Sequence, residues 1–364
     1  MKRIIFPMLK KITALICVLA VFFSIGCITM EQDTEHFWDF SDNLDLYISA
    51  ADESWLDDFY AGDFFLESSL FNTFGMEAVR LTASSAPFHI PMPSAPGTAV
   101  EANELVIVDY SNAHDGYIMV RFLDPPPANE PVMVITVGPN GFQHNHIMLI
   151  SREYDIIPLT AGSGEYVIAV GEPVNGQLAV LLQTKINADI ADEFAPFLRP
   201  SRHINYTLDS KVVKKADELI GGRTDLDLIE RIRMVYEFVV SHFEYDWDLL
   251  PYLAANPYYI PDLDFVLDYG KAICYGYSSV MAAMLRSQGI ITRQVIGWMT
   301  HPDGRVEYHA WIDVYSTTEG WLTGIVFFDG NGYSRLDPTV ASSGGETGER
   351  FAMDSSNYRV EKYH

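Results

Sequence analysis

The middle of the chain is a succession of short apolar runs broken by glycine, proline or asparagine. Between Glu104 and about Asp189 the runs are rich in valine, isoleucine and tyrosine: LVIVDYS, GYIMVRFL, VMVITVG, HIMLIS, YDIIPLT, EYVIAVGEP and QLAVLLQTKI. Such runs predict β-strands, and several in series are typical of an antiparallel β-sandwich. We therefore expect a β-sandwich domain over about residues 100–195, acting as a spacer or orienting domain, with a ligand-binding module as the alternative.

Apolar residues recur at helical spacing after this region. Two stripes are Val212, Val213, Ala216, Leu219 and Ile220, and Leu228, Ile229, Ile232, Val235, Tyr236 and Val239. They predict two core helices, the first capped by Asp209 or Ser210 and the second by Thr224 or Asp225.

A third helix is predicted to begin at Cys274 and to end at Gly289. Three strand patterns follow, over residues 291–299, 306–315 and 321–329, and then the segment RLDPT at 335–339. Three strands behind one helix predict an α+β arrangement.

The first residues have the pattern of an export signal. Four basic residues precede an apolar run from Ile12 to Ile25, which is a basic n-region followed by an h-region. Ser24 and Gly26 precede Cys27, so cleavage after Gly26 by a lipoprotein-type signal peptidase would leave a lipidated Cys27 as the membrane anchor. A single N-terminal transmembrane anchor or full secretion are the alternatives. All three make residues 1–26 a signal or anchor and place the rest of the chain outside the cytoplasm.

Residues 27–99 are predicted to be an acidic aromatic N-terminal region followed by a linker. Residues 31–79 contain 13 acidic side chains and no lysine or arginine, interleaved with aromatic residues. This composition favours short helices that dock elsewhere. The stretch SSAPFHIPMPSAPGT at 84–98 is typical of a linker.

Charge and cysteine content argue against nucleic-acid binding and draw attention to one thiol. Residues 1–26 hold four of the 24 basic residues and none of the 49 acidic ones, so the remainder carries a formal charge of 20 minus 49, or −29. Such a surface repels nucleic acid. With Cys17 in the signal and Cys27 acylated, Cys274 would be the one thiol of the folded region, either inert and buried or reactive.

Cys274, His309 and Asp337 are the candidate catalytic residues. Cys274 opens a helix, where unpaired N–H groups and the positive end of the helix dipole favour a thiolate. His309 shares one strand face with Trp311 and Asp313, and Asp337 stands at the end of a later strand. A thiol, an imidazole and a carboxylate are the parts of an activated nucleophile.

Nearby aromatic and polar residues have simpler interpretations. Trp298 and Trp311 are expected in the core, Asp313 as a polar neighbour, and His301 and Asp329 in turns.

The segment from about residue 210 to 340 resembles the transglutaminase-like superfamily. Its motifs are a cysteine that opens a helix, a His-Ala-Trp strand, here 309–311, and an Asp-Pro-Thr strand end, here 337–339. The resemblance implies an α+β protein with a papain-like transglutaminase core over about 196–364, preceded by the antiparallel β-sandwich.

The resemblance also implies roles for individual residues. Cys274 would be the nucleophile, His309 the general base and acid, and Asp337 the group that fixes the imidazole tautomer. Many members carry an upstream tryptophan or glutamine that helps to bind the oxyanion. Trp247 matches no such motif, so one donor is the Cys274 N–H and the second is unassigned.

We therefore expect an extracytoplasmic, protease-like thiol enzyme that cleaves or transfers amide bonds of proteins or peptides, cell-wall-associated ones included. The alternatives are a protein cross-linking transglutaminase and a catalytically inert surface binding or scaffold lipoprotein. No cofactor is expected. No metal is expected either, because there is no EF-hand loop, and because His144 and His146 share a strand face without an obvious third ligand.

Overall fold

The computed structural model describes the C-terminal three quarters of the chain, with internal gaps. The described residues are 92–364 except 124–131, 149–151, 175–176, 256–258, 301–303, 305, 319, 324–338 and 340–356. The predictions for the export signal, Cys27, the acidic aromatic region, His301, Asp329 and Asp337 lie outside the described residues. No helix among the described residues is long and apolar enough to cross a membrane.

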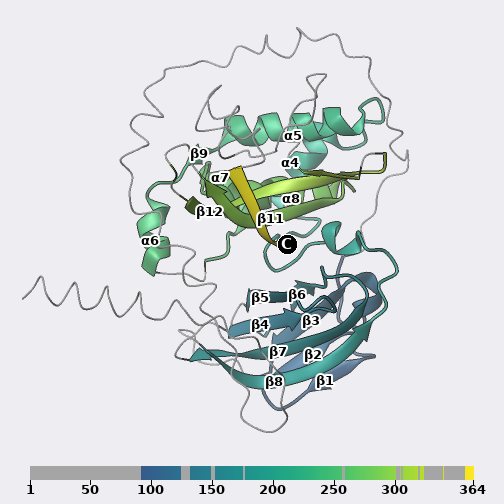
Figure 1. The fold of residues 1–364 in the computed structure, drawn as a ribbon. Coiled ribbons are helices and arrows are strands. Elements are labelled where there is room, and N and C mark those ends of the chain that lie inside the picture. Colours follow the sequence, from purple (N-terminus) through teal and green to yellow (C-terminus); the bar gives the residue numbers. More distant parts are fainter. Residues whose placement is uncertain are drawn as a thin grey trace, which may run out of the picture.

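The first eight strands form two antiparallel sheets that lie face to face (Figure 1). The strands are β1 (Val100–Ala102), β2 (Val106–Asp109), β3 (Tyr117–Phe122), β4 (Val132–Val137), β5 (Gln143–Met148), β6 (Asp155–Pro158), β7 (Gly164–Val174) and β8 (Gln177–Ala188). The sheet orders are β1-β2-β3-β6 and β5-β4-β7-β8. Val120 and Ile157 of the first sheet share one apolar cluster with Val134 and Ile168 of the second, as in a β-sandwich.

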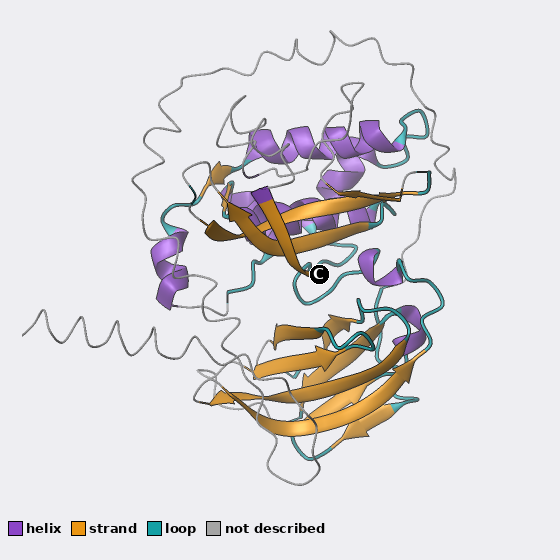
Figure 2. Ribbon diagram, in the orientation of Figure 1, coloured by secondary structure: helices purple, strands orange, loops and turns teal. Residues whose placement is uncertain are grey.

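The remaining elements form a second, helix-bearing half (Figure 2). Its helices are α4 (Lys211–Ile220), α5 (Leu228–His242), α6 (Leu249–Ala255), α7 (Leu263–Tyr269) and α8 (Cys274–Ser287). Its strands are β9 (Glu244–Tyr245), β10 (Lys271–Ala272), β11 (Thr292–Thr300), β12 (Val306–Ser316), β13 (Gly320–Thr323) and β14 (Tyr358–Tyr363). The sheet order β13-β12-β11-β14 is antiparallel throughout. The predicted α+β class is confirmed.

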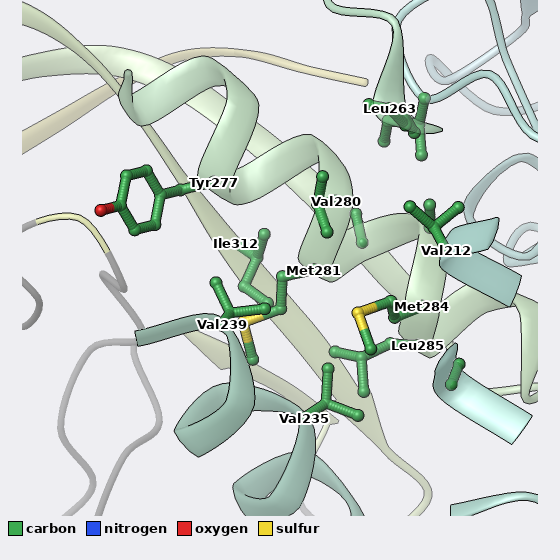
Figure 3. Packing of buried hydrophobic residues seen from close by; sticks show 14 of the residues in the cluster. Val212, Val235, Val239, Leu263, Tyr277, Val280, Met281, Met284, Leu285 and Ile312 are labelled. Carbon is green, nitrogen blue, oxygen red and sulfur yellow. The ribbon is translucent and has the colours of Figure 1, made fainter. Parts of the chain in front are cut away.

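Helix α8 is the centre of this half. Its side chains from Tyr277 to Leu285 are buried on all sides, which is expected of a helix enclosed by other elements. Figure 3 shows Met281 packed with Val239 of α5 and Ile312 of β12. The helix that begins at Cys274 is therefore held between α4 and α5 on one side and the sheet on the other.

The helix caps differ in part from those expected. Ser210 occupies the N-cap position of α4, as one of the two predicted candidates. For α5 the N-cap is Asp227, not Thr224 or Asp225: its Oδ1 accepts the Glu230 N–H at 2.8 Å, and Glu230 accepts the Asp227 N–H at 2.9 Å. This reciprocal pair is a capping box. The N-cap of α5 therefore lies two or three residues later than predicted from the sequence.

The segment between β8 and α4 joins the two halves. It includes the short 3-10 helix η5 (Ala195–Phe197); another, η4 (Ala113–Asp115), precedes β3. Phe197 meets Trp321 of β13 edge to face at 5.3 Å. Arg202 donates through its backbone N–H to the Ile156 carbonyl and through Nε to the Ile147 carbonyl, at 2.8 and 3.0 Å. One connection thus contacts both halves.

Arg286 near the end of α8 binds three separate parts of the chain. Its fully buried guanidinium donates to the carbonyl oxygens of Thr292 and Arg199 and to a backbone oxygen of His364, at 2.7, 2.9 and 2.7 Å. Burial lowers the pKa of this group to about 10, so the side chain is still a cation near neutrality. A buried cation is tolerated because its donors are used by these carbonyls.

Candidate functional site

Cys274 is the first residue of α8 and is partly exposed. Ile273 is its N-cap and offers no side-chain oxygen, so the first N–H groups of the helix have no side-chain cap. These are the N–H groups that lack intrahelical acceptors and carry the positive end of the helix dipole. The arrangement offers N–H donors to an oxyanion that forms beside the sulfur.

The first turn of α8 fits tightly against the strand that leads into it. A Cβ added to Gly276 would lie 2.9 Å from the Ala272 Cβ and 3.6 Å from Cγ1 of Val266. The absence of a side chain at position 276 therefore allows β10 and α8 to approach closely on both sides of Cys274.

Polar contacts from the sheet also hold this turn. The fully buried Gln294 of β11 donates through Nε2 to Ser278 Oγ at 2.7 Å, Ser279 Oγ at 2.9 Å and the Tyr275 carbonyl at 3.3 Å. The Ser278 hydroxyl in turn donates to the Cys274 carbonyl at 2.8 Å. The backbone around the thiol is thus held by β11, through contacts that no sequence pattern predicts.

His309 lies in β12 and is 3% exposed. Its Nδ1 is 3.8 Å from a carboxylate oxygen of Glu307, and its ring is 6.3 Å from that of the fully buried Trp311. The pairing of β12 with β11 sets His309 opposite Gly297. The imidazole is therefore confined by the sheet and by the aromatic ring two residues further on.

Asp313 has a structural partner in the neighbouring strand. Its Oδ2 accepts from the Arg293 guanidinium at 2.9 and 3.0 Å, and Arg293 is stacked over the rings of Trp321 and Tyr363. The expectation of a polar neighbour fits this arrangement. Trp311 is fully buried, as expected, whereas Trp298 is only half-buried and donates its indole N–H to Glu361 at 2.8 Å.

The segment just before Trp247 pairs with the strand that leads into Cys274. Strands β9 and β10 are parallel, with Tyr245 opposite Ala272, and the Asp246 N–H donates to the Ala272 carbonyl at 2.9 Å. This pairing brings the segment before Trp247 next to the residues that lead into Cys274. Trp247 is half-buried and its ring is 4.2 Å from that of Tyr245. It thereby becomes a candidate for the unassigned oxyanion donor.

The structure places two of the three predicted site residues on adjoining elements. Helix α8, which begins with Cys274, packs directly against β12, which carries His309. Asp337 lies outside the described residues.

Comparison with known proteins identifies one family. Residues 214–338 match the family model of the transglutaminase-like superfamily, and this range contains Cys274, His309 and Asp337. No curated protein matches the sequence.

Solved structures of low similarity also align with the chain. A provisionally named cysteine protease from Cytophaga hutchinsonii has 11% identity and a TM-score of 0.35, covering 68% of this chain and 76% of that one. A provisionally named protease from Parabacteroides distasonis has 11% identity, a TM-score of 0.24, and covers 58% and 60%. Red sea bream transglutaminase has 12% identity, a TM-score of 0.20, and covers 67% and 56%. These similarities are too low to indicate which reaction this chain catalyses.

Proposed function

Residues 214–338 are a domain of the transglutaminase-like superfamily, and from this premise we propose that the chain is a thiol enzyme acting on amide bonds of proteins or peptides. Cys274 is the nucleophile, His309 the general base and acid, and Asp337 the acceptor that orients the imidazole. Hydrolysis is the favoured outcome, and transfer to an amine is the second.

The proposed reaction has two steps. The Cys274 sulfur attacks the amide carbonyl carbon, and the carbonyl oxygen becomes an oxyanion next to the Cys274 N–H. The His309 imidazolium gives its proton to the leaving amine as the C–N bond breaks, which leaves a thioester. His309 then takes a proton from water, the hydroxide oxygen attacks the thioester, and the thiolate leaves with a carboxylic acid as product.

The observation that carries the proposal is the exposure of Cys274. From Tyr277 to Leu285 the side chains of α8 are buried, but the thiol one turn earlier is partly accessible to solvent. An inert free cysteine is among the most buried of residues. A reactive one requires solvent access together with a helix N-terminus or a nearby cation.

The test combines thiol labelling with substrate turnover on the intact protein. We expect iodoacetamide to label Cys274 faster than free cysteine, and a peptide library to be cleaved by wild type but not by Cys274→Ala. His309→Ala should reduce labelling to the rate of free cysteine, and Asp337→Asn should reduce turnover by about 100-fold or more. His242→Ala is the matched control, because this histidine is exposed on α5 and bonded to the Leu267 carbonyl.

The outcomes separate the candidate functions. Incorporation of a primary-amine probe into a glutamine peptide would select cross-linking over hydrolysis. Labelling at the rate of free cysteine in both wild type and His309→Ala would overturn the enzyme proposal and favour an inert binding or scaffold protein.

The proposed location is extracytoplasmic, with lipid on Cys27 as the anchor. Support comes from the basic and apolar pattern of residues 1–26 and the small residues before Cys27. Intact-mass analysis of the membrane fraction should find a chain that begins at an acylated Cys27. An unmodified Cys27, or retention of residues 1–26, would contradict this part of the proposal.

A further inference from the structure

Four histidines from three distant segments meet between the two halves of the molecule. His144 and His146 belong to β5, His203 to the connection before α4, and His364 follows β14. All four are buried, with exposures of 0 to 4%. Figure 1 shows the C end of the chain, where His364 lies, between the helix-bearing half and strands β5 and β6.

The imidazole rings are in mutual contact. The ring centroids of His203 and His364 are 3.7 Å apart, those of His144 and His146 are 4.5 Å apart, and those of His144 and His364 are 4.8 Å apart. One ring nitrogen from each of His146, His203 and His364 lies within 4.8 Å of the other two. Three potential ligand atoms therefore already converge on one point.

Most of the ring nitrogens of this cluster have no partner among the described residues. Five buried ones make no hydrogen bond there: Nε2 of His144, Nδ1 and Nε2 of His146, Nε2 of His203 and Nδ1 of His364. Buried polar groups in folded proteins are nearly always satisfied. Such a concentration of unpaired nitrogens favours binding of a ligand that accepts lone pairs.

We propose that His146, His203 and His364 bind a divalent transition-metal ion of the zinc type, with His144 placed to supply a fourth nitrogen. Zinc takes imidazole ligands in a tetrahedral arrangement at about 2.0–2.1 Å, so its ligand nitrogens lie about 3.3 Å apart. The observed upper limit of 4.8 Å requires each ring to move by about 1 Å or less toward the ion. Imidazole ligands suit zinc, copper or nickel rather than calcium or magnesium.

The protonation state of the cluster fits this role. Burial lowers the pKa of His146 to about 3 and holds the pKa values of His144, His203 and His364 well below the ordinary histidine value. All four rings are therefore neutral near pH 7, which is the form that binds metal. The charge of Lys362 on the cluster and that of Arg202 on His203 lower these pKa values further, although the same charges repel a metal cation. Asp155 lies 3.7 Å from Arg202 and offsets its charge.

The outer contacts orient two of the ligands. His203 Nδ1 lies 2.6 Å from the Tyr275 hydroxyl, which leaves Nε2 for the metal. His144 Nδ1 lies 3.5 Å from the Thr160 hydroxyl oxygen. Such partners fix the tautomer of metal-binding histidines. Because Tyr275 follows Cys274 directly, the ion would fasten the first turn of α8 to the β-sandwich, whether or not the thiol is catalytic.

The experiment uses the full chain, stripped with a chelator and titrated with zinc and separately with cobalt. We expect one zinc per chain and an intense visible cobalt spectrum typical of tetrahedral nitrogen ligation. His146→Gln and His364→Gln should each weaken zinc binding more than 100-fold and abolish that spectrum. Tyr275→Phe, which removes only an outer contact, should weaken binding about tenfold. Lys362→Met should tighten it, because a cation facing the ion is removed.

The exposed His114, bonded to the Asp189 carbonyl, provides the matched control: His114→Gln should leave stoichiometry and spectrum unchanged. Circular dichroism checks that each variant is folded. If the ligand variants do not fold, X-ray absorption of the zinc-loaded wild type decides, with three or four imidazole nitrogens at about 2.0 Å expected. Less than 0.1 zinc per chain, an octahedral cobalt spectrum, or a tetrahedral spectrum that persists in His146→Gln would each overturn the proposal.

Discussion

Gly276→Ala should lower the free energy of unfolding when residue 272 is alanine and raise it when residue 272 is glycine. The added methyl would stand 2.9 Å from the Ala272 Cβ, closer than two carbon atoms normally approach, and 3.6 Å from Val266, an ordinary contact. Neither methyl has a rotamer through which to escape, so the backbone has to move. Overpacking of this kind costs about 1–3 kcal/mol. Alanine gains at most about 1 kcal/mol over glycine in a helix, so we expect a net loss of about 1 kcal/mol.

The same substitution in an Ala272→Gly background should be stabilising. With the Ala272 methyl absent, only the helix-propensity gain of up to about 1 kcal/mol remains. The coupling free energy between positions 272 and 276 should therefore be about 1–3 kcal/mol. The two positions flank Cys274, so the single variant should also alter the labelling rate of the thiol, and the double variant should restore it.

Urea unfolding followed by tryptophan emission measures this double-mutant cycle. Four of the six tryptophans lie in the helix-bearing half and none lies in strands β1 to β8; the four are Trp247, Trp298, Trp311 and Trp321. The signal therefore reports on the half that contains α8. If Gly276→Ala shifted the free energy of unfolding by the same amount in both backgrounds, the close approach of Ala272 would not be the reason for a glycine at position 276.

Two further substitutions test the α5 cap and the oxyanion site. Asp227→Ala should lower the free energy of unfolding by about 1 kcal/mol through loss of the capping box, whereas Thr224→Ala should change it by less than about 0.5 kcal/mol; equal urea midpoints for the two would contradict this assignment. Trp247→Phe should reduce kcat by about 100-fold with little change in KM, as removal of a donor used only in the transition state does. Tyr245→Phe is the neighbouring control, and normal turnover in Trp247→Phe would move the second donor elsewhere.

The sequence predicts most of the elements because their patterns are strong. Strands β2, β3, β4, β6, β7 and β8 coincide with short apolar runs between turn residues. Helices α4, α5 and α8 each carry a continuous apolar stripe. Helix α7 is missed because it has only seven residues, and β14 because its sequence YRVEKY alternates with charged side chains and no turn signal marks it.

The site is predictable only where its parts are local in the sequence. The start of α8 at Cys274 and the strand with His309 follow from pattern and spacing. The pairing of β9 with β10, which leads into Cys274, and the packing of Gln294 under the first turn arise from tertiary contacts. The four-histidine cluster could not be foreseen, because β5 supplies only two of its members and the others come from segments remote in sequence.

Strand β14 has a consequence for the order in which the chain can fold. It pairs with the edge of β11 that β12 leaves open, and the residue after it supplies one of the three backbone oxygen acceptors of the buried Arg286. Until β14 has been synthesised, this edge of β11 has no β14 partner and Arg286 has no acceptor from His364. Exposed strand edges are where partly synthesised chains associate with one another. Pairing of β14 with β11 therefore both closes this strand edge and brings the last backbone acceptor to Arg286 of the helix that carries the thiol.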